Sequence, residues 1–160
     1  MSKQKVGVIG AGSFGTAVAN ILSKNSDVLL YARNPESVQL ISETRTSAKQ
    51  TLAENIEVTN DLEHIARQCN VIFPVVPSSN FRELMRQFSP FLHPYHTLIH
   101  GTKGLDLTTS SGEVTREDVK TMSEVIKEES VVVRVGCMAG PNIASELAMN
   151  QPAATVIASP

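Results

Sequence analysis

A glycine-rich segment near the N-terminus has the spacing that binds dinucleotide phosphates. Residues 10–15 read Gly-Ala-Gly-Ser-Phe-Gly, between an apolar strand-like run and a helical pattern. In that context Gly10 permits a tight turn, Gly12 lets a pyrophosphate approach the backbone, and Gly15 lets the helix pack on the sheet. The free N–H groups at the start of the helix favour the phosphate charge. A glycine turn without a ligand is the alternative interpretation.

The residue that follows the second apolar run indicates which dinucleotide would bind. Sites selective for NAD usually carry Asp or Glu there, which accepts a hydrogen bond from the ribose 2′-hydroxyl. This chain has Tyr31-Ala32-Arg33-Asn34, without a carboxylate. Because a guanidinium can pair with a 2′-phosphate, Arg33 predicts that NADPH (NADP) is preferred, with NAD also possible. A solvated surface arginine is the alternative.

Two further segments follow apolar runs, and ligands of open α/β sheets bind at the carboxyl ends of strands. Val76-Pro77-Ser78-Ser79 begins a helix, and we expect Pro77 to line the nicotinamide side of a cofactor site. In Gly101-Thr102-Lys103-Gly104 the lysine lies among glycines. Its ammonium therefore has little cover and can reach a phosphate or a carbonyl oxygen. An ordinary exposed turn lysine fits the same residues.

A third segment has a turn followed by a helix start. Gly140-Pro141 sets the turn, and Asn142 is expected to cap a helix over residues 142–149. The first N–H groups of that helix would face an anion. A plain turn and cap without a ligand is equally consistent with these residues.

Short apolar runs alternate with helical patterns along the chain. The predicted strands are 6–9, 28–31, 56–58, 71–76, 97–100, 131–135 and 154–157. Two helices are predicted at 13–22 and 142–149. Three more are predicted from their caps: one begins at Pro35 and is capped by Asn34, one is capped by Asn60 or Asp61, and one is capped by Ser78 or Ser79 before Phe81. A further helix is predicted behind Thr115 and Asp118 and would bury Val119, Met122 and Ile126. Residues 44–55 are expected to form a loop. This alternation predicts a Rossmann-type, doubly wound, mainly parallel sheet with helices on both faces.

Composition excludes several classes of protein. The 160 residues are 41% hydrophobic and 19% charged, with a net charge of -2, so nothing indicates disorder or a partner nucleic acid. No apolar run approaches the roughly 20 residues of a membrane helix. Cys69 and Cys137 stand far apart without a CxxC or a nearby His, so we expect two free thiols, no metal site and a cytoplasmic protein.

Taken together, these residues resemble the nucleotide-binding half of the NAD(P)-dependent glycerol-3-phosphate dehydrogenases. Members of that family carry GAGSWGTA near the N-terminus, an Arg after the second strand, a VPS turn, a KG pair after a strand, and a GPSFA- or GANIASE-type segment. The matching residues here are GAGSFGTA at 10–17, Arg33, 76–78, 103–104 and GPNIASE at 140–146. Phe14 replaces the usual Trp and Asn142 replaces the bacterial Ser. Pro74 departs from the expectation for a central strand.

The resemblance implies a role for each matched residue. The cofactor would contact Gly10, Gly12, Ser13, Phe14, Gly15, Arg33, Pro77, Lys103 and Ala144. The substrate would contact Lys103, Gly140 and Asn142, and Lys103 would also be catalytic. The implied reaction is reversible hydride transfer between the nicotinamide and dihydroxyacetone phosphate, which yields sn-glycerol 3-phosphate for glycerophospholipid synthesis.

Family members continue into a helical domain that supplies a proton-transferring lysine. We therefore expect residues 1–160 to form the NAD(P)-binding domain alone, inactive without the rest, and compatible with a homodimeric full-length enzyme. Two alternatives stay open. One is the nucleotide half of another two-domain dehydrogenase, such as a β-hydroxyacid dehydrogenase or a ketopantoate reductase. The other is a stand-alone NADPH-sensing module.

Overall fold

A seven-stranded sheet forms the centre of the molecule in the computed structural model, which describes residues 5–108 and 113–159. The strand order is β11-β10-β7-β6-β1-β2-β5. The strands are β1 (Lys5–Ile9), β2 (Asp27–Tyr31), β5 (Ile56–Thr59), β6 (Val71–Pro74), β7 (Thr97–His100), β10 (Arg134–Ala139) and β11 (Val156–Ala158). All neighbours pair in parallel except β10 and β11, which are antiparallel. This is the 3-2-1-4-5-6 order of dinucleotide-binding sheets with a seventh strand added, so the Rossmann-type prediction is confirmed.

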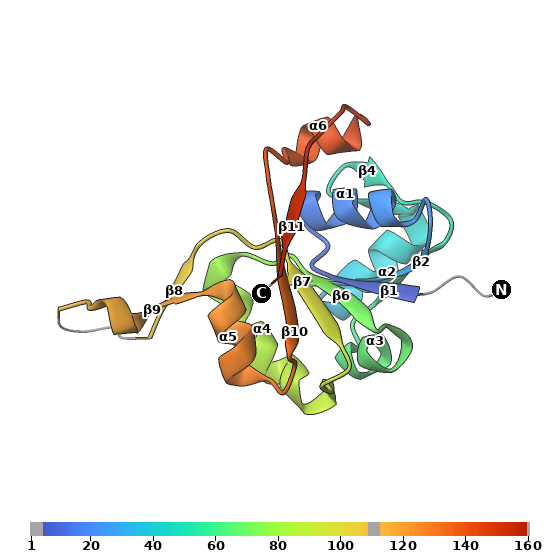
Figure 1. The fold of residues 1–160 in the computed structure, drawn as a ribbon. Coiled ribbons are helices and arrows are strands. Elements are labelled where there is room, and N and C mark those ends of the chain that lie inside the picture. The colour runs from blue at the N-terminus through green and yellow to red at the C-terminus, as the bar shows by residue number, and fades with distance from the viewer. Residues whose placement is uncertain (1–4, 109–112, 160) are drawn as a thin grey trace.

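Helices cover both faces of this sheet (Figure 1). Those beside β1, β2 and β5 on one face are α1 (Ser13–Leu22) and α2 (Pro35–Thr44). Those on the other face are α3 (Leu62–Gln68), α4 (Phe81–Phe88) and α5 (Met122–Glu129), while α6 (Ala144–Ala148) lies against α1. Among the described residues, no helix is both long and apolar enough to cross a membrane.

Successive strand residues belong to two separate hydrophobic cores because side chains alternate across a sheet. In β2, Leu29 is packed in the core beneath α3, α4 and α5, whereas Val28 and Leu30 are packed in the core beneath α1 and α2. All three are at most 1% exposed. Each continuous apolar run that predicted a buried strand therefore contributes alternate side chains to the two cores.

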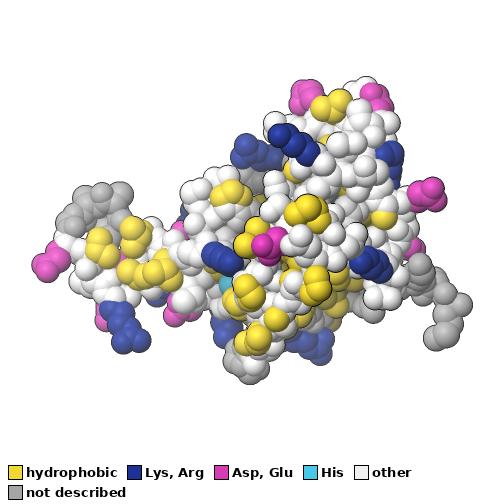
Figure 2. Space-filling view, turned by 90° about the horizontal axis from the view of Figure 1, so that it is seen from above, with side chains coloured by type: hydrophobic (Ala, Val, Ile, Leu, Met, Phe, Trp, Pro, Cys, Tyr) yellow, Lys and Arg dark blue, Asp and Glu magenta, His cyan; other side chains and the backbone are white. Residues whose placement is uncertain are grey.

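Two short ribbons extend from the main sheet. One pairs β3 (Thr46–Ser47) with β4 (Gln50–Thr51), and the other pairs β8 (Leu105–Leu107) with β9 (Val119–Thr121). The second ribbon projects away from the body (Figure 1), and apolar side chains are visible on this projection in Figure 2. Two of its apolar residues, Leu105 and Leu107, are more than half exposed.

Three predicted elements differ from the structure. Residues 44–55 were expected to form a loop but contain β3 and β4. The strand predicted at 131–135 starts later, as β10, because its pairing with β7 begins at Arg134. Of the valines before Arg134, on which the strand prediction rested, two are largely at the surface, with Val131 56% and Val133 70% exposed. The strand predicted at 71–76 ends at Pro74, whose missing N–H suits the end of a strand.

Other predicted boundaries also shift. Behind Thr115 lies only a 3₁₀ turn, η3 (Arg116–Asp118), and Val119 is part of β9. The helix α5 starts later with its own capping box, in which Thr121 Oγ1 accepts from the Glu124 amide and the Glu124 carboxylate accepts from the Thr121 amide. The predicted 142–149 helix shortens to α6, and 154–157 becomes β11 at 156–158.

Of the remaining predicted N-caps, one is confirmed by a capping hydrogen bond and the others are not. Asp61 caps α3 by accepting a 2.9 Å hydrogen bond from the His64 amide, as one of the two predicted choices. Asn34 stands at the N-cap of α2 without a side-chain capping bond. Ser78 and Ser79 instead open the 3₁₀ turn η1 (Ser78–Asn80), and the short turn η2 (Ser89–Phe91) follows α4.

Candidate functional site

The turn from β1 into α1 has steric requirements that explain two of its three glycines. Gly10 has a φ of +123°, and a Cβ there would lie 2.9 Å from the Val75 carbonyl oxygen. A Cβ on Gly15 would lie 1.8 Å from the Gly10 carbonyl oxygen. The first glycine therefore permits the turn and the third permits close packing of helix on strand, the two roles that their positions predicted.

Gly12 is different because the protein itself leaves it room. A Cβ at this position would meet no heavy atom within 4 Å. Gly12 is also the N-cap of α1, and no side chain among the described residues caps this helix. The free space and the N–H groups at the helix start lie together, as a site for a phosphate group requires.

A cavity of about 300 Å³ lies beside the start of α1. Three loops that are distant in the sequence line it. They are the glycine loop (Gly12, Ser13, Phe14 and Gly15), the end of β6 (Val75, Val76 and Pro77) and the end of β7 (Gly101, Thr102 and Lys103). The structure thus brings Pro77 and Lys103 to the glycine loop, at the carboxyl ends of neighbouring strands.

Close contacts hold these three loops together. Thr102 Oγ1 donates a 2.7 Å hydrogen bond to the Val76 carbonyl oxygen. A Cβ on Gly101 would lie 2.9 Å from the Phe14 ring, so only glycine lets the ring approach. Lys103 itself is exposed. Its backbone is fixed by neighbours on both sides, while its ammonium remains free to meet a ligand.

Arg33 lies at the other end of the glycine loop, two residues after β2. It lines a cavity of about 290 Å³ together with Gly10, Gly12 and Pro77, and a second of about 410 Å³ on the α2 side with Ser37 and Ser47. The Arg33 charge also reaches Tyr31, where burial raises the pKa of the phenol and the nearby guanidinium opposes that rise. Arg33 therefore lines two cavities that both border the glycine loop.

The sequence and the fold match one family. The family model for the N-terminus of NAD-dependent glycerol-3-phosphate dehydrogenase matches residues 5–160. The chain belongs to this family. Its membership decides against the other two-domain dehydrogenases that the first 35 residues resemble.

Individual relatives agree with this assignment. A glycerol-3-phosphate dehydrogenase (NAD(P)+) from Psychrobacter cryohalolentis is 34% identical over 163 residues, which cover 99% of this chain and 36% of the relative. One from Acinetobacter baylyi is 33% identical over 160 residues, covering 97% of this chain and 42% of the relative. The crystal structure of glycerol-3-phosphate dehydrogenase from Coxiella burnetii superposes with a TM-score of 0.83 at 28% identity, over 98% of this chain and 47% of that one. The chain thus spans less than half of each.

Three residues that the family resemblance assigned to ligands lie on a separate segment. Gly140 has a φ of +151°, and a Cβ there would collide with the Ala154 carbonyl oxygen at 2.4 Å. Asn142 does not cap α6, because the N-cap of that helix is Ile143. Asn142 Oδ1 instead accepts a 2.7 Å hydrogen bond from Thr155 Oγ1. Neither these two nor Ala144 line the cavity beside Lys103.

The β3–β4 ribbon also supports the glycine loop, a contribution that no pattern in the sequence indicated. Ser47 Oγ donates a 2.8 Å hydrogen bond to the Ala11 carbonyl oxygen, and Gln50 Nε2 donates one of 2.8 Å to the Ser13 carbonyl oxygen. The ribbon turns through Ala48 and Lys49, both with positive φ. Neither is a residue that typically marks such a turn, so the sequence contained little signal.

The described residues contain no group of three or more His, Cys, Asp or Glu side chains that could hold a metal ion. Cys69 is buried, Cys137 is half-buried, and both are free thiols. Burial raises the pKa of the Cys69 thiol to about 12, with a smaller opposing effect from Lys5. Neither thiol lines the cavity beside Lys103.

Proposed function

We propose that this chain is the NAD(P)-binding domain of an enzyme that interconverts dihydroxyacetone phosphate and sn-glycerol 3-phosphate, with NADPH preferred over NADH. The observation that carries the proposal is the cavity formed jointly by the glycine loop, Pro77 and Lys103. Family membership and the names of the relatives support the reaction. The product would feed glycerophospholipid synthesis in the cytoplasm.

The residues of the glycine loop suit a dinucleotide. Gly10 makes the turn, Gly12 beside it leaves backbone space for the pyrophosphate, and the start of α1, at Ser13, offers N–H groups to its charge. Arg33 would pair with the 2′-phosphate of the adenosine ribose, and Phe14, Gly15 and Pro77 would line the nicotinamide end. When bound, the cofactor supplies or accepts the hydride.

Lys103 is the residue in this cavity that suits an anionic substrate. Its ammonium would bind the ground state of a phosphorylated ketone and stabilise the transition state more, because the carbonyl oxygen gains negative charge as hydride arrives. Lys103 would touch both cofactor and substrate. Gly140 and Asn142 would contact the substrate and Ala144 the cofactor, which requires their segment to approach the cavity when ligands bind.

The test is a titration of the protein with NADPH and with NADH, repeated with Arg33→Asp. A charge-assisted contact contributes roughly 1.5–3 kcal/mol, so we expect wild-type protein to bind NADPH on the order of 10- to 100-fold more tightly. Arg33→Asp should abolish that preference, whereas the control Arg67→Asp, at an exposed arginine of α3, should preserve it. Equal affinities that Arg33→Asp leaves unchanged would contradict the proposal.

A further inference from the structure

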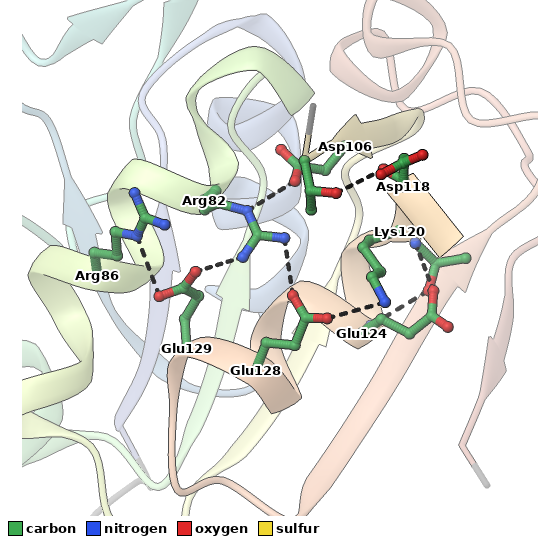
Figure 3. Close-up of polar contacts among 10 residues, drawn as sticks. Arg82, Arg86, Asp106, Asp118, Lys120, Glu124, Glu128 and Glu129 are labelled. Atoms are coloured by element: carbon green, nitrogen blue, oxygen red, sulfur yellow. Dashed lines mark hydrogen bonds and ion pairs between the residues drawn. The ribbon is translucent and has the colours of Figure 1, made fainter. Parts of the chain in front are cut away.

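A group of charged side chains, buried in part, lies beside the candidate site without lining its cavity. Arg82, in the first turn of α4, is at the centre of this group (Figure 3). Its side chain is 17% exposed, and its guanidinium donates to three carboxylates. These are Asp106 at 2.7 Å, Glu128 at 2.9 Å, and Glu129. Arg86 and Lys120 complete the group by pairing with Glu129 and Glu128.

The three carboxylates come from two different elements. Asp106 lies in β8, three residues after Lys103, and Glu128 and Glu129 are the last two residues of α5. Arg82 follows the Pro77–Ser78 loop by one helical turn. One guanidinium therefore joins two of the three loops that line the cavity, those after β6 and β7, to a helix behind them. A planar fork with five donors can do this, whereas a lysine ammonium cannot reach all three partners in that geometry.

Partial burial alone lowers the pKa of the Arg82 guanidinium, but its hydrogen bonds to the three carboxylates outweigh this effect and raise the pKa. The charge is therefore permanent at any pH at which the protein is folded. A permanent charge shared by three acids gives a fixed anchor, and that anchor does not depend on bound ligand.

The backbone is held on both sides of Lys103, and on the C-terminal side residues 105–107 pair with β9. Thr102 is fixed to Val76, and Gly104 has a φ of +124° and rests against Ser78, where a Cβ would lie 2.8 Å from the serine Oγ. The ribbon beyond it projects from the body (Figure 1), and its Leu105 is more than half exposed. The Arg82–Asp106 ion pair ties this segment, just after Lys103, directly to α4.

We propose that Arg82, through Asp106, is a positioning residue for Lys103. It holds the Lys103–Gly104 backbone against the Pro77–Ser78 loop so that the ammonium meets the substrate at a fixed place. This inference rests on the proposed function for the role of Lys103, but the positioning itself can be measured without any turnover.

The direct test is hydrogen exchange of the full-length protein followed by mass spectrometry. Asp106→Asn is nearly isosteric and leaves Arg82 paired with both glutamates, so the fold should survive. We expect exchange in residues 101–107 to accelerate by at least tenfold, with the α5 peptides unchanged. The control is Arg86→Gln, an arginine one turn along α4 that pairs with Glu129 but not with the ribbon. Unchanged exchange in 101–107 would overturn the positioning role, whether or not the protein reduces dihydroxyacetone phosphate.

The second test is a double-mutant cycle on the reduction of dihydroxyacetone phosphate. If Asp106 acts through Lys103, Asp106→Asn should lower kcat/KM at least tenfold in the wild-type background and less than twofold in Lys103→Ala. Arg82→Lys should restore only part of the activity lost in Arg82→Met. Equal losses in both backgrounds would show a merely structural role and overturn the inference. If the wild-type protein fails to reduce this substrate, the proposed function fails, and the exchange result still decides the positioning.

Discussion

Ser47 Oγ lies 2.8 Å from the carbonyl oxygen of Ala11, although 36 positions separate the two residues. This bond fixes the β3–β4 ribbon to the middle of the glycine loop. Thr16 strengthens the link, because its Oγ1 donates to Ser47 Oγ at 3.1 Å and both side chains are buried. The shape of the loop therefore depends on residues outside the glycine motif.

Ser47→Ala should weaken the binding of NADPH. Of the two hydrogen bonds that this change removes, the one to Ala11 acts directly on the loop, and its loss costs about 1 kcal/mol, which corresponds to an affinity about fivefold lower. The free energy of unfolding should fall by a similar amount, as measured by chemical denaturation. Ser145→Ala, at an exposed serine of α6, is the matched control. An affinity that changes no more in Ser47→Ala than in that control would contradict the coupling of ribbon and loop.

Lys103→Ala, in the full-length protein, should lower kcat/KM for dihydroxyacetone phosphate at least about 100-fold, because a positive charge at the developing oxyanion is lost. An exposed lysine contributes little to packing, so the melting temperature should hold. Lys103→Arg should recover only part of the activity, since a planar fork does not replace a compact ammonium. Lys127→Ala, at an exposed lysine of α5, serves as the control. If Lys103→Ala kept a near-normal kcat/KM, the prediction would be wrong and Lys103 would be an ordinary exposed turn lysine.

The Arg82 group should make the protein sensitive to acid. Burial raises the pKa of Glu129, but hydrogen bonds from Arg82 and Arg86 outweigh this and hold the pKa below its ordinary value. A carboxylate with a lowered folded-state pKa stabilises the protein above its unfolded pKa of about 4.3, and that stabilisation is lost as pH falls through the folded pKa.

We therefore expect the free energy of unfolding to decline as pH falls from about 5 toward 3, and to decline less steeply in Glu129→Gln. Chemical denaturation at a series of pH values measures both slopes. Glu54→Gln, at an exposed glutamate outside the group, should follow the wild-type curve. The same acid slope in Glu129→Gln and in wild-type protein would refute the assignment.

The two thiols should react at very different rates. A pKa of about 12 leaves about one Cys69 thiol in 10,000 ionised at pH 8, and the side chain is fully buried. A thiol reagent should therefore modify one equivalent rapidly, at Cys137, and a second only in denaturant. Cys137→Ser should remove the rapid phase. If two thiols of the native wild-type protein reacted in the rapid phase, this prediction would be contradicted.

The parts of the site that local spacing determines were predictable. The glycine loop requires its glycines because of contacts within a few residues and with the adjoining strand, so the motif and its context suffice to predict it. Strands β1 and β2 were placed within a residue because each is an almost continuous buried run, and β7, whose residues alternate between half-buried and buried, has the bounds that were predicted. The positions of Arg33 and Lys103 shortly after strands therefore followed from the sequence, whereas the strand before Pro77 ends at Pro74 rather than at Val76.

The parts that depend on distant partners were not predictable. Ser47 matters because it reaches Ala11, and Arg82 because it reaches Asp106 and α5, yet no periodicity marks either residue. The start of β10 is set by the pairing of Arg134 with Thr97, while the preceding valines look like a strand and lie partly at the surface. Long-range pairing, rather than local propensity, decided each of these cases.

The division of β2 between two cores limits how this domain can change in length. If one residue were inserted or deleted in the middle of β2, the side chains beyond it would turn to the opposite face, and Leu29 and Leu30 would exchange cores. A change of one residue in length would therefore disrupt both cores. We expect natural length variation among related sequences to fall instead in the ribbons, where an added residue lengthens a turn and leaves the alternation of the sheet intact.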